Sequence, residues 1–168
     1  IEKYHPEVVS QNGWLSKTPL SVIKKFERNI YNQHPAPLDP EHKGIFGRPQ
    51  HFGGKGIFGK AAHASVLEFL RLSGRVFPTE ASIHRVTMKL DEGEVVARRP
   101  VDIFPGDTAE SLSLRMLQIE YDLQIEFLNS VYEGSVKALV RNKQLIDTSD
   151  VHILEEAKKN AVKMYPHG

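Results

Sequence analysis

The sequence contains no cysteine, and this absence excludes several kinds of chemistry. Without a thiol, the chain can form neither a disulfide nor a thiolate metal site, and it has no cysteine nucleophile. No apolar run approaches the roughly 18 residues that are needed to cross a bilayer. The opening residues, IEKYHPEVVSQ, also lack the basic and apolar regions of a signal peptide. These absences predict a cytoplasmic protein without a membrane partner.

The chain also has almost no net charge. Its 22 Lys and Arg residues and 21 Asp and Glu residues give a formal charge of +1. There is therefore no global field to attract nucleic acid, and any anionic partner must be held by local groups. A length of 168 residues with 40% hydrophobic content predicts one domain with one core. The sequence leaves the oligomeric state open.

Hydrophobic periodicity predicts alternating strands and helices, and hence the α/β class. Apolar residues recur at helical spacing in three segments. The first segment follows Pro19, the second ends at Gly74, and the third is a long helix that ends at Gly134. Asp107 and Glu110 form a plausible capping box for this long helix. Strands are predicted over 7–11, 29–34, 81–88 and 94–104, and helices over 20–26, 60–74, 109–134 and 152–164.

Two of these predictions describe how neighbouring segments pair. The segment KLDEG suits a tight reversal, so the strands on either side of it are predicted to form an antiparallel hairpin. The segments SVKALV and QLID indicate a second, peripheral hairpin. We accordingly expect residues 1–136 to form the main body of the domain and residues 137–168 to add a peripheral hairpin and a last helix.

The segment HFGGKGIFGK contains the pattern G-x-G-x-x-G at Gly54, Gly56 and Gly59. A dinucleotide-binding loop needs a strand directly before its first glycine and an acidic residue at the end of the next strand, and neither is predicted here. No Ser or Thr follows a Gly-Lys pair, as a P-loop would require. We interpret residues 35–59 as a long glycine-rich surface loop, or a mobile lid, that takes no part in chemistry.

A better candidate site flanks this loop. Asn32 and His34 end a predicted strand, where alternation points both side chains to the same face. A neutral amide and an imidazolium suit the stabilisation of an oxyanion. His84 lies inside a later strand and Asp91 in the following turn. By pattern alone, His84 is typical of a core histidine, Asp91 of a turn residue and Asn32 of a strand-end cap.

The segments NQHPAPL, GKAAHASVL, SIHRVTMKLDEGEVV, PVDIFPGDTAESLSLRMLQIEYDLQ and FLNSVYEGSV resemble, in this order, the formyltransferase family. Within that family they look most like glycinamide ribonucleotide formyltransferase. The resemblance implies formyl transfer from 10-formyltetrahydrofolate, as cosubstrate and without a metal, to the amine of a ribonucleotide in purine biosynthesis. Asn32, His34 and Asp91 would occupy the catalytic places. His63 and His84 would support them.

The resemblance also implies binding residues and a fold. The nucleotide would lie near Pro35 and Glu120, and the sheet would be Rossmann-like and mostly parallel with an antiparallel hairpin. Trp14 is equally typical of an ordinary core residue. The folate would lie against Trp14, Leu15, Thr87, Met88, Leu90 and Gly93.

The family begins with a strand and a glycine-rich turn that bind the substrate phosphate, and no such segment precedes Glu7. The N-terminal part of the fold is therefore expected to be missing, either because the sequence is a fragment or because the protein has lost it. Three alternatives stay open: a formyltetrahydrofolate hydrolase, another formyltransferase of the family, and a non-catalytic binding or regulatory module.

The formyltransferase mechanism requires a particular geometry. Asn32, His34 and Asp91 should converge on one cleft at the carboxyl end of the sheet. We expect Asp91 to project from a solvent-facing turn and to lie within a hydrogen bond, or one bridging water, of His34. Asp91 would then keep His34 protonated.

Overall fold

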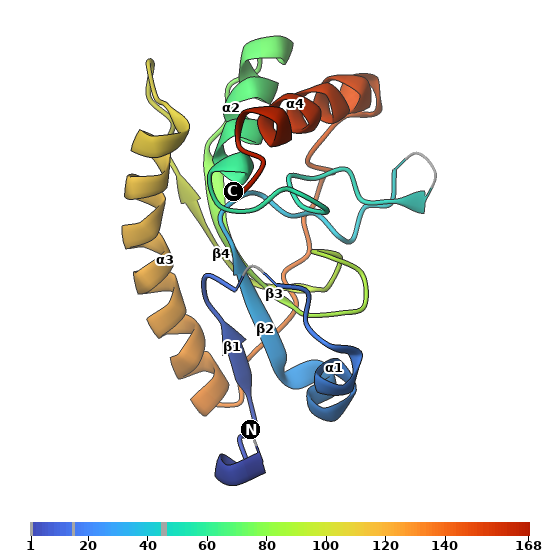
Figure 1. Cartoon of the computed structure of the whole chain (residues 1–168), viewed down its shortest axis with the longest axis vertical. Helices are drawn as coiled ribbons and strands as arrows, with labels where there is room; N and C mark the ends of the chain where they lie inside the picture. Colours follow the sequence, from blue (N-terminus) through green and yellow to red (C-terminus); the bar gives the residue numbers. More distant parts are fainter. Residues whose placement is uncertain (1, 15, 45–46) are drawn as a thin grey trace.

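The computed structural model describes residues 2–14, 16–44 and 47–168, which fold around a central sheet (Figure 1). The strands are β1 (Val9–Gln11), β2 (Ile30–His34), β3 (Thr79–Arg85) and β4 (Val95–Val101), in the order β1-β2-β3-β4. The β1 and β2 strands are parallel, whereas β2–β3 and β3–β4 are antiparallel. The α/β class and the β3–β4 hairpin are thus confirmed, but the prediction of a mostly parallel sheet is wrong.

The path of the chain after β2 explains this difference. Loop 35–59 and the following helix bring the chain back to the end of the sheet that β2 has just left. The pairing of His34 with Ser82 shows that β3 starts beside the end of β2, so the two strands must run in opposite directions. Ser82 Oγ also donates a hydrogen bond to the Ala36 carbonyl just beyond β2.

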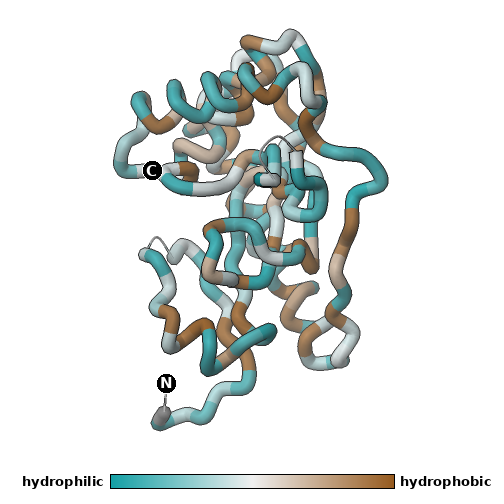
Figure 2. Tube along the Cα trace, turned by 90° about the vertical axis from the view of Figure 1, so that its right-hand side faces the viewer, coloured by the Kyte–Doolittle hydropathy of each residue, from teal (hydrophilic) through white to brown (hydrophobic). Residues whose placement is uncertain are grey.

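Two apolar clusters hold the helices in place. Helix α3 (Ala109–Tyr132) packs on the sheet through Met116, Phe127 and their neighbours. Helices α2 (Lys60–Ser73) and α4 (Val151–Met164) pack against each other in a second cluster (Figure 1). Each of these helices carries both apolar and polar residues, because one face of the helix is buried and the other faces solvent (Figure 2). Within the described ranges, no helix is long and apolar enough to cross a membrane.

Helix boundaries follow the expected signals, with one correction. Helix α1 spans Leu20–Phe26, and α2 ends at Gly74, which has a left-handed φ of 68°. The capping box of α3 is formed by Thr108 and Ser111 rather than by Asp107 and Glu110. The carboxylate of Asp107 instead accepts hydrogen bonds from the Phe104 amide and from the side chain of Arg115.

The predicted hairpin between α3 and α4 is wrong, because residues 135–147, all of them described, contain no strand. This segment bonds to the sheet and its loops instead of pairing with itself. The Leu139 amide donates to the Val95 carbonyl, Arg141 pairs with Glu80, and the Leu145 amide donates to Asp39.

The glycine-rich loop is anchored rather than free. Phe52 and Ile57 are buried in the α2–α4 cluster, and the Phe52 ring lies edge-on to Phe69 with their centroids 5.5 Å apart. The interpretation of residues 35–59 as a surface loop is therefore wrong at Phe52 and Ile57. These contacts hold the segment before α2 beside the end of β2.

Candidate active site

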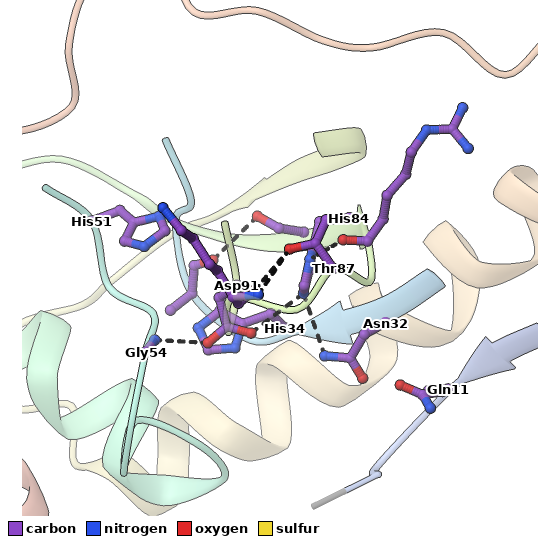
Figure 3. A network of polar contacts seen from close by, with 12 residues as sticks. Gln11, Asn32, His34, His51, Gly54, His84, Thr87 and Asp91 are labelled. Atoms are coloured by element: carbon purple, nitrogen blue, oxygen red, sulfur yellow. Dashed lines mark hydrogen bonds and ion pairs between the residues drawn. The ribbon is translucent and has the colours of Figure 1, made fainter. Parts of the chain in front are cut away.

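One large cleft, with a volume of about 630 Å³, opens where β2, the turn between β3 and β4, the glycine-rich loop and α3 meet. Asn32 and His34 reach it from the end of β2, and Asp91 reaches it from the turn. Two segments that are distant in sequence thus place the three expected catalytic side chains in one cavity. Figure 3 shows these side chains together, with His84 between Asn32 and Asp91.

His84 links Asn32 to Asp91. Strand pairing sets His84 directly opposite Asn32, and Asn32 Nδ2 lies 3.4 Å from His84 Nε2. His84 Nδ1 lies 3.0 Å from the Arg85 carbonyl, which can only accept, so Nδ1 carries a proton. In the neutral ring, Nε2 therefore accepts from Asn32. In the imidazolium, the same atom donates towards Asp91 Oδ1, which is 3.5 Å away.

The Asp91 carboxylate is enclosed. Its side chain is 14% exposed, and Oδ2 accepts a 2.7 Å hydrogen bond from the Gly54 amide. The expectation of a solvent-facing carboxylate was wrong, because the glycine-rich loop covers the turn. Burial by itself would raise the pKa of Asp91, but His34, His84 and the Gly54 amide together hold this pKa below its ordinary value. Asp91 is therefore ionised at neutral pH.

His34 is buried at the end of β2 and has its own hydrogen-bond partner. Its Nε2 donates a 2.6 Å hydrogen bond to the Phe52 carbonyl, which leaves Nδ1 as the acceptor in the neutral ring. Burial lowers the pKa of His34 more than the charge of Asp91 raises it. The ring is thus neutral at pH 7, not the imidazolium that we expected. The direct partner of Asp91 is His84 rather than His34.

Two further buried histidines surround this centre. His63, on the first turns of α2, lines the cleft, and burial lowers its pKa to about 4. Its Nδ1 has no hydrogen-bond partner in the described part of the chain. His51 accepts the Asp39 amide at Nδ1, and burial lowers its pKa to about 3. No three His, Asp or Glu side chains of residues 2–14, 16–44 and 47–168 are grouped to hold a metal.

The residues expected to bind folate form one side of the cleft, with two exceptions. Trp14, Met88 and Leu90 line it and are 52%, 66% and 47% exposed, so Trp14 is not a core residue. Thr87 lines it as well. Gly93 does not: it is buried, and a Cβ there would lie 1.8 Å from the Arg85 carbonyl oxygen. Its role is close backbone packing. The remaining residue, Leu15, falls outside the described residues.

The residues expected to bind the nucleotide also line the cleft. Pro35 follows His34 directly, and Glu120 faces the cleft from α3. Burial raises the pKa of the Glu120 carboxyl to about 7, so this group is partly protonated at neutral pH. Gln33 Nε2 donates to the Glu120 carbonyl and fixes α3 against the end of β2.

Sequence reasoning missed the contribution of the glycine-rich loop. Gly54 supplies the amide that binds Asp91, and Gly53 packs so closely that a Cβ there would lie 2.8 Å from Asp91 Cβ. Adjacent glycines often mark a close approach of backbone to another group, and this was the available signal. No sequence pattern pointed to His51.

Comparison with known proteins places these residues in a family. Residues 1–128 match the family described as "Formyl transferase". A phosphoribosylglycinamide formyltransferase from Arabidopsis thaliana, described as chloroplastic, is 33% identical over 151 residues, which cover 86% of this chain and 46% of that protein. The chain therefore spans less than half the length of that relative.

Solved structures share the fold at low identity. The formyltransferase PseJ from Anoxybacillus kamchatkensis, in complex with a UDP-sugar and tetrahydrofolate, matches with a TM-score of 0.56 and 18% identity over 83% of this chain and 62% of its own. A formyltetrahydrofolate deformylase from Pseudomonas syringae matches with a TM-score of 0.57 and 18% identity over 84% of this chain and 40% of its own.

Proposed function

Because the chain belongs to the formyl transferase family, we propose that it transfers a formyl group from 10-formyltetrahydrofolate to the amine of glycinamide ribonucleotide in purine biosynthesis. The observation that carries this proposal is the convergence of Asn32, His34 and Asp91 on one cleft. The named activity of the Arabidopsis relative supports the acceptor, and the tetrahydrofolate bound to PseJ supports the donor.

The reaction needs a stabilised oxyanion. Attack of the amine nitrogen on the formyl carbon forms a C–N bond and turns the formyl oxygen into an oxyanion. The Asn32 side-chain amide is the neutral donor at the end of β2 for this charge. One such preorganised donor stabilises the transition state by about 3 kcal/mol. The bond from the formyl carbon to the folate nitrogen then breaks.

The reaction also needs a proton carrier. The attacking nitrogen becomes an ammonium, and the leaving folate nitrogen must receive a proton. Neutral His34 has a free lone pair at Nδ1, because Nε2–H is bonded to the Phe52 carbonyl. His34 takes the proton at Nδ1 and returns it to the folate nitrogen, while ionised Asp91 stabilises the transient imidazolium.

Substrate binding is assigned to the other lining residues. The exposed apolar side chains of Trp14, Met88 and Leu90 would hold the folate ring system. Pro35 and Glu120 would lie beside the nucleotide, and the Glu120 carboxyl would pair with its ribose hydroxyls.

A hydrolase is the second candidate, because the deformylase from Pseudomonas syringae has the same fold. In that case, the residues that activate the amine would activate water. The whole chain, incubated with 10-formyltetrahydrofolate with and without glycinamide ribonucleotide, distinguishes the candidates by mass spectrometry. Formylated nucleotide supports the transferase. Formate release that is independent of the nucleotide supports the hydrolase. Folate binding without turnover supports a non-catalytic module.

A further inference from the structure

Helix α4 lies outside the family match to residues 1–128, yet it sends a charged side chain towards the active site. Lys158 lies on the same helix as Leu154 and Ala157, which are fully buried against α2. Its Nζ donates a 3.1 Å hydrogen bond to the backbone carbonyl of His51. Lys158 is partly buried, and this burial lowers the pKa of its ammonium.

The carbonyl that Lys158 binds belongs to the segment that orients the catalytic side chains. We call residues 51–54 the anchor segment. The next carbonyl of the anchor segment, that of Phe52, accepts a hydrogen bond from His34 Nε2–H. The Gly54 amide of the same segment donates a hydrogen bond to Asp91. Lys158 therefore binds the anchor segment at the His51 carbonyl, one residue before the Phe52 carbonyl that contacts His34. A carbonyl that accepts from a partly buried ammonium is held more strongly than one that accepts from a neutral donor.

Several ionisable groups face His34. Asp91 comes from the β3–β4 turn, His84 from β3, His63 from α2 and His51 from the anchor segment, and Lys158 faces it from α4. Burial and the charge of Lys158 both lower the pKa of His34, while Asp91 raises it. Removal of the Lys158 charge would shift the balance towards the imidazolium.

We propose that Lys158 is a positioning residue of the active site: its ammonium clamps the anchor segment against β2 and the β3–β4 turn, and so fixes His34 through Phe52 and Asp91 through Gly54. As a statement about formyl transfer, this rests on the proposed function. Helix α4 then belongs to the catalytic apparatus although it lies beyond the matched region. Lys158 itself does not line the cleft.

The test uses the full chain with the substitution Lys158→Met. Its matched control is Lys159→Met, which removes the same charge from an exposed position on the same helix. Histidine ring signals followed by NMR between pH 4 and 8 report the protonation of His34 without any substrate. We expect Lys158→Met to raise the pKa of His34, because the charge of Lys158 lowers it. Lys159→Met should leave it unchanged, and Lys158→Arg should preserve the original titration.

Turnover supplies the second readout. We expect kcat to fall about tenfold in Lys158→Met, with its pH profile displaced upwards and KM for folate nearly unchanged. If His34 titrates with the same pKa in Lys158→Met and in the unmodified chain, the proposed role of Lys158 is wrong. If the unmodified chain transfers no formyl group, the proposed function fails, but the titration still decides the clamp.

A third measurement serves if Lys158→Met does not fold. In the unmodified chain, the Lys158 Nζ protons should exchange slowly with water and show cross-relaxation to residues 51 and 52, in contrast to those of Lys159. Fast exchange at Lys158 overturns the proposal.

Discussion

The two sides of the cleft are built in different ways. On the inner wall, formed by Asn32, His34, Gly54, His84 and Asp91, the polar groups bond to one another or to backbone. The outer wall, formed by Trp14, Met88, Leu90, Glu120 and Tyr121, presents large side chains that are mostly exposed. The inner wall is therefore set before a ligand arrives, while the outer wall has room to adapt.

This difference predicts that the inner wall governs the rate of the reaction and the outer wall governs the affinity for ligands. Preorganised donors and acceptors lower a reaction barrier because they need no rearrangement during the reaction. Exposed apolar side chains contribute to binding through the area that a ligand removes from water. Changes on the inner wall should therefore act on turnover, and changes on the outer wall should act on ligand binding.

The largest effect is expected for Asp91→Asn on the inner wall. Formyl transfer should fall by about 10³-fold, because the neutral amide cannot stabilise a protonated His34. The unfolding free energy should fall as well, because an ionised carboxylate whose pKa is held below its ordinary value stabilises the fold, although the Asn side-chain oxygen can still accept the Gly54 amide proton. Rate assays measure the effect on turnover, and thermal melts measure the effect on stability. Near-normal turnover in Asp91→Asn would refute the assigned mechanism.

Acid should affect the buried histidines His51 and His63 and the outer-wall residue Glu120 in opposite directions. Burial holds the pKa of His51 at about 3 and that of His63 at about 4 in the folded chain, below the usual 6.5. Their contribution to stability is therefore complete above pH 6.5 and is lost as the pH falls. Each should cost about 2 kcal/mol at pH 5. Glu120 has a raised pKa of about 7, so folding gains about 2 kcal/mol from it over the same decrease in pH.

Urea unfolding at pH 7 and pH 5 separates these contributions. Both chains should lose unfolding free energy over this decrease in pH, and Glu120→Gln should lose about 2 kcal/mol more than the unmodified chain because the offsetting group is gone. If Glu120→Gln is no more sensitive to acid than the unmodified chain, Glu120 does not offset the cost of the buried histidines.

A smaller effect is expected from Gly53→Ala, which tests how tightly the inner wall is packed. The new methyl group would meet Asp91 Cβ and Leu38 Cδ2, both 2.8 Å away, and would displace the carboxylate. Turnover should fall about tenfold. The control is Gly44→Ala, whose methyl group would meet the Gln50 side chain, which can move. Equal rates for the two variants would show that the position of Asp91 tolerates displacement.

The smallest effect is expected from Trp14→Ala on the outer wall. Loss of this half-exposed ring should weaken folate binding about fivefold and leave the single-turnover rate unchanged. Calorimetry and rapid mixing measure the two quantities. Tyr4→Ala removes an exposed ring away from the cleft and serves as the control. A slower chemical step in Trp14→Ala would remove the distinction between the walls.

Local sequence signals accounted for most elements and part of the site. Alternation along 29–34 placed Asn32 and His34 on the same face, and the resemblance added Asp91 across a gap that periodicity cannot bridge. The direction of β3 was mispredicted, because it depends on where α2 returns the chain. Lys158 and His51 lie 107 positions apart, and only the packing of α4 on α2 brings them together. The extended path of 135–147 is set by Arg141 and Asp39 rather than by the local propensity of the segment.

Asp91 has a positive φ of 56°, in the region that suits glycine and asparagine better than most residues. The backbone at this position therefore does not require an aspartate, and the proposed role in formyl transfer would account for the carboxylate. Selection of random variants for heat resistance alone should admit asparagine at position 91 more often than selection for growth that depends on formyl transfer, which should hold the aspartate. The frequency of residues at position 91 in two such libraries would thus report whether a population is under selection for catalysis.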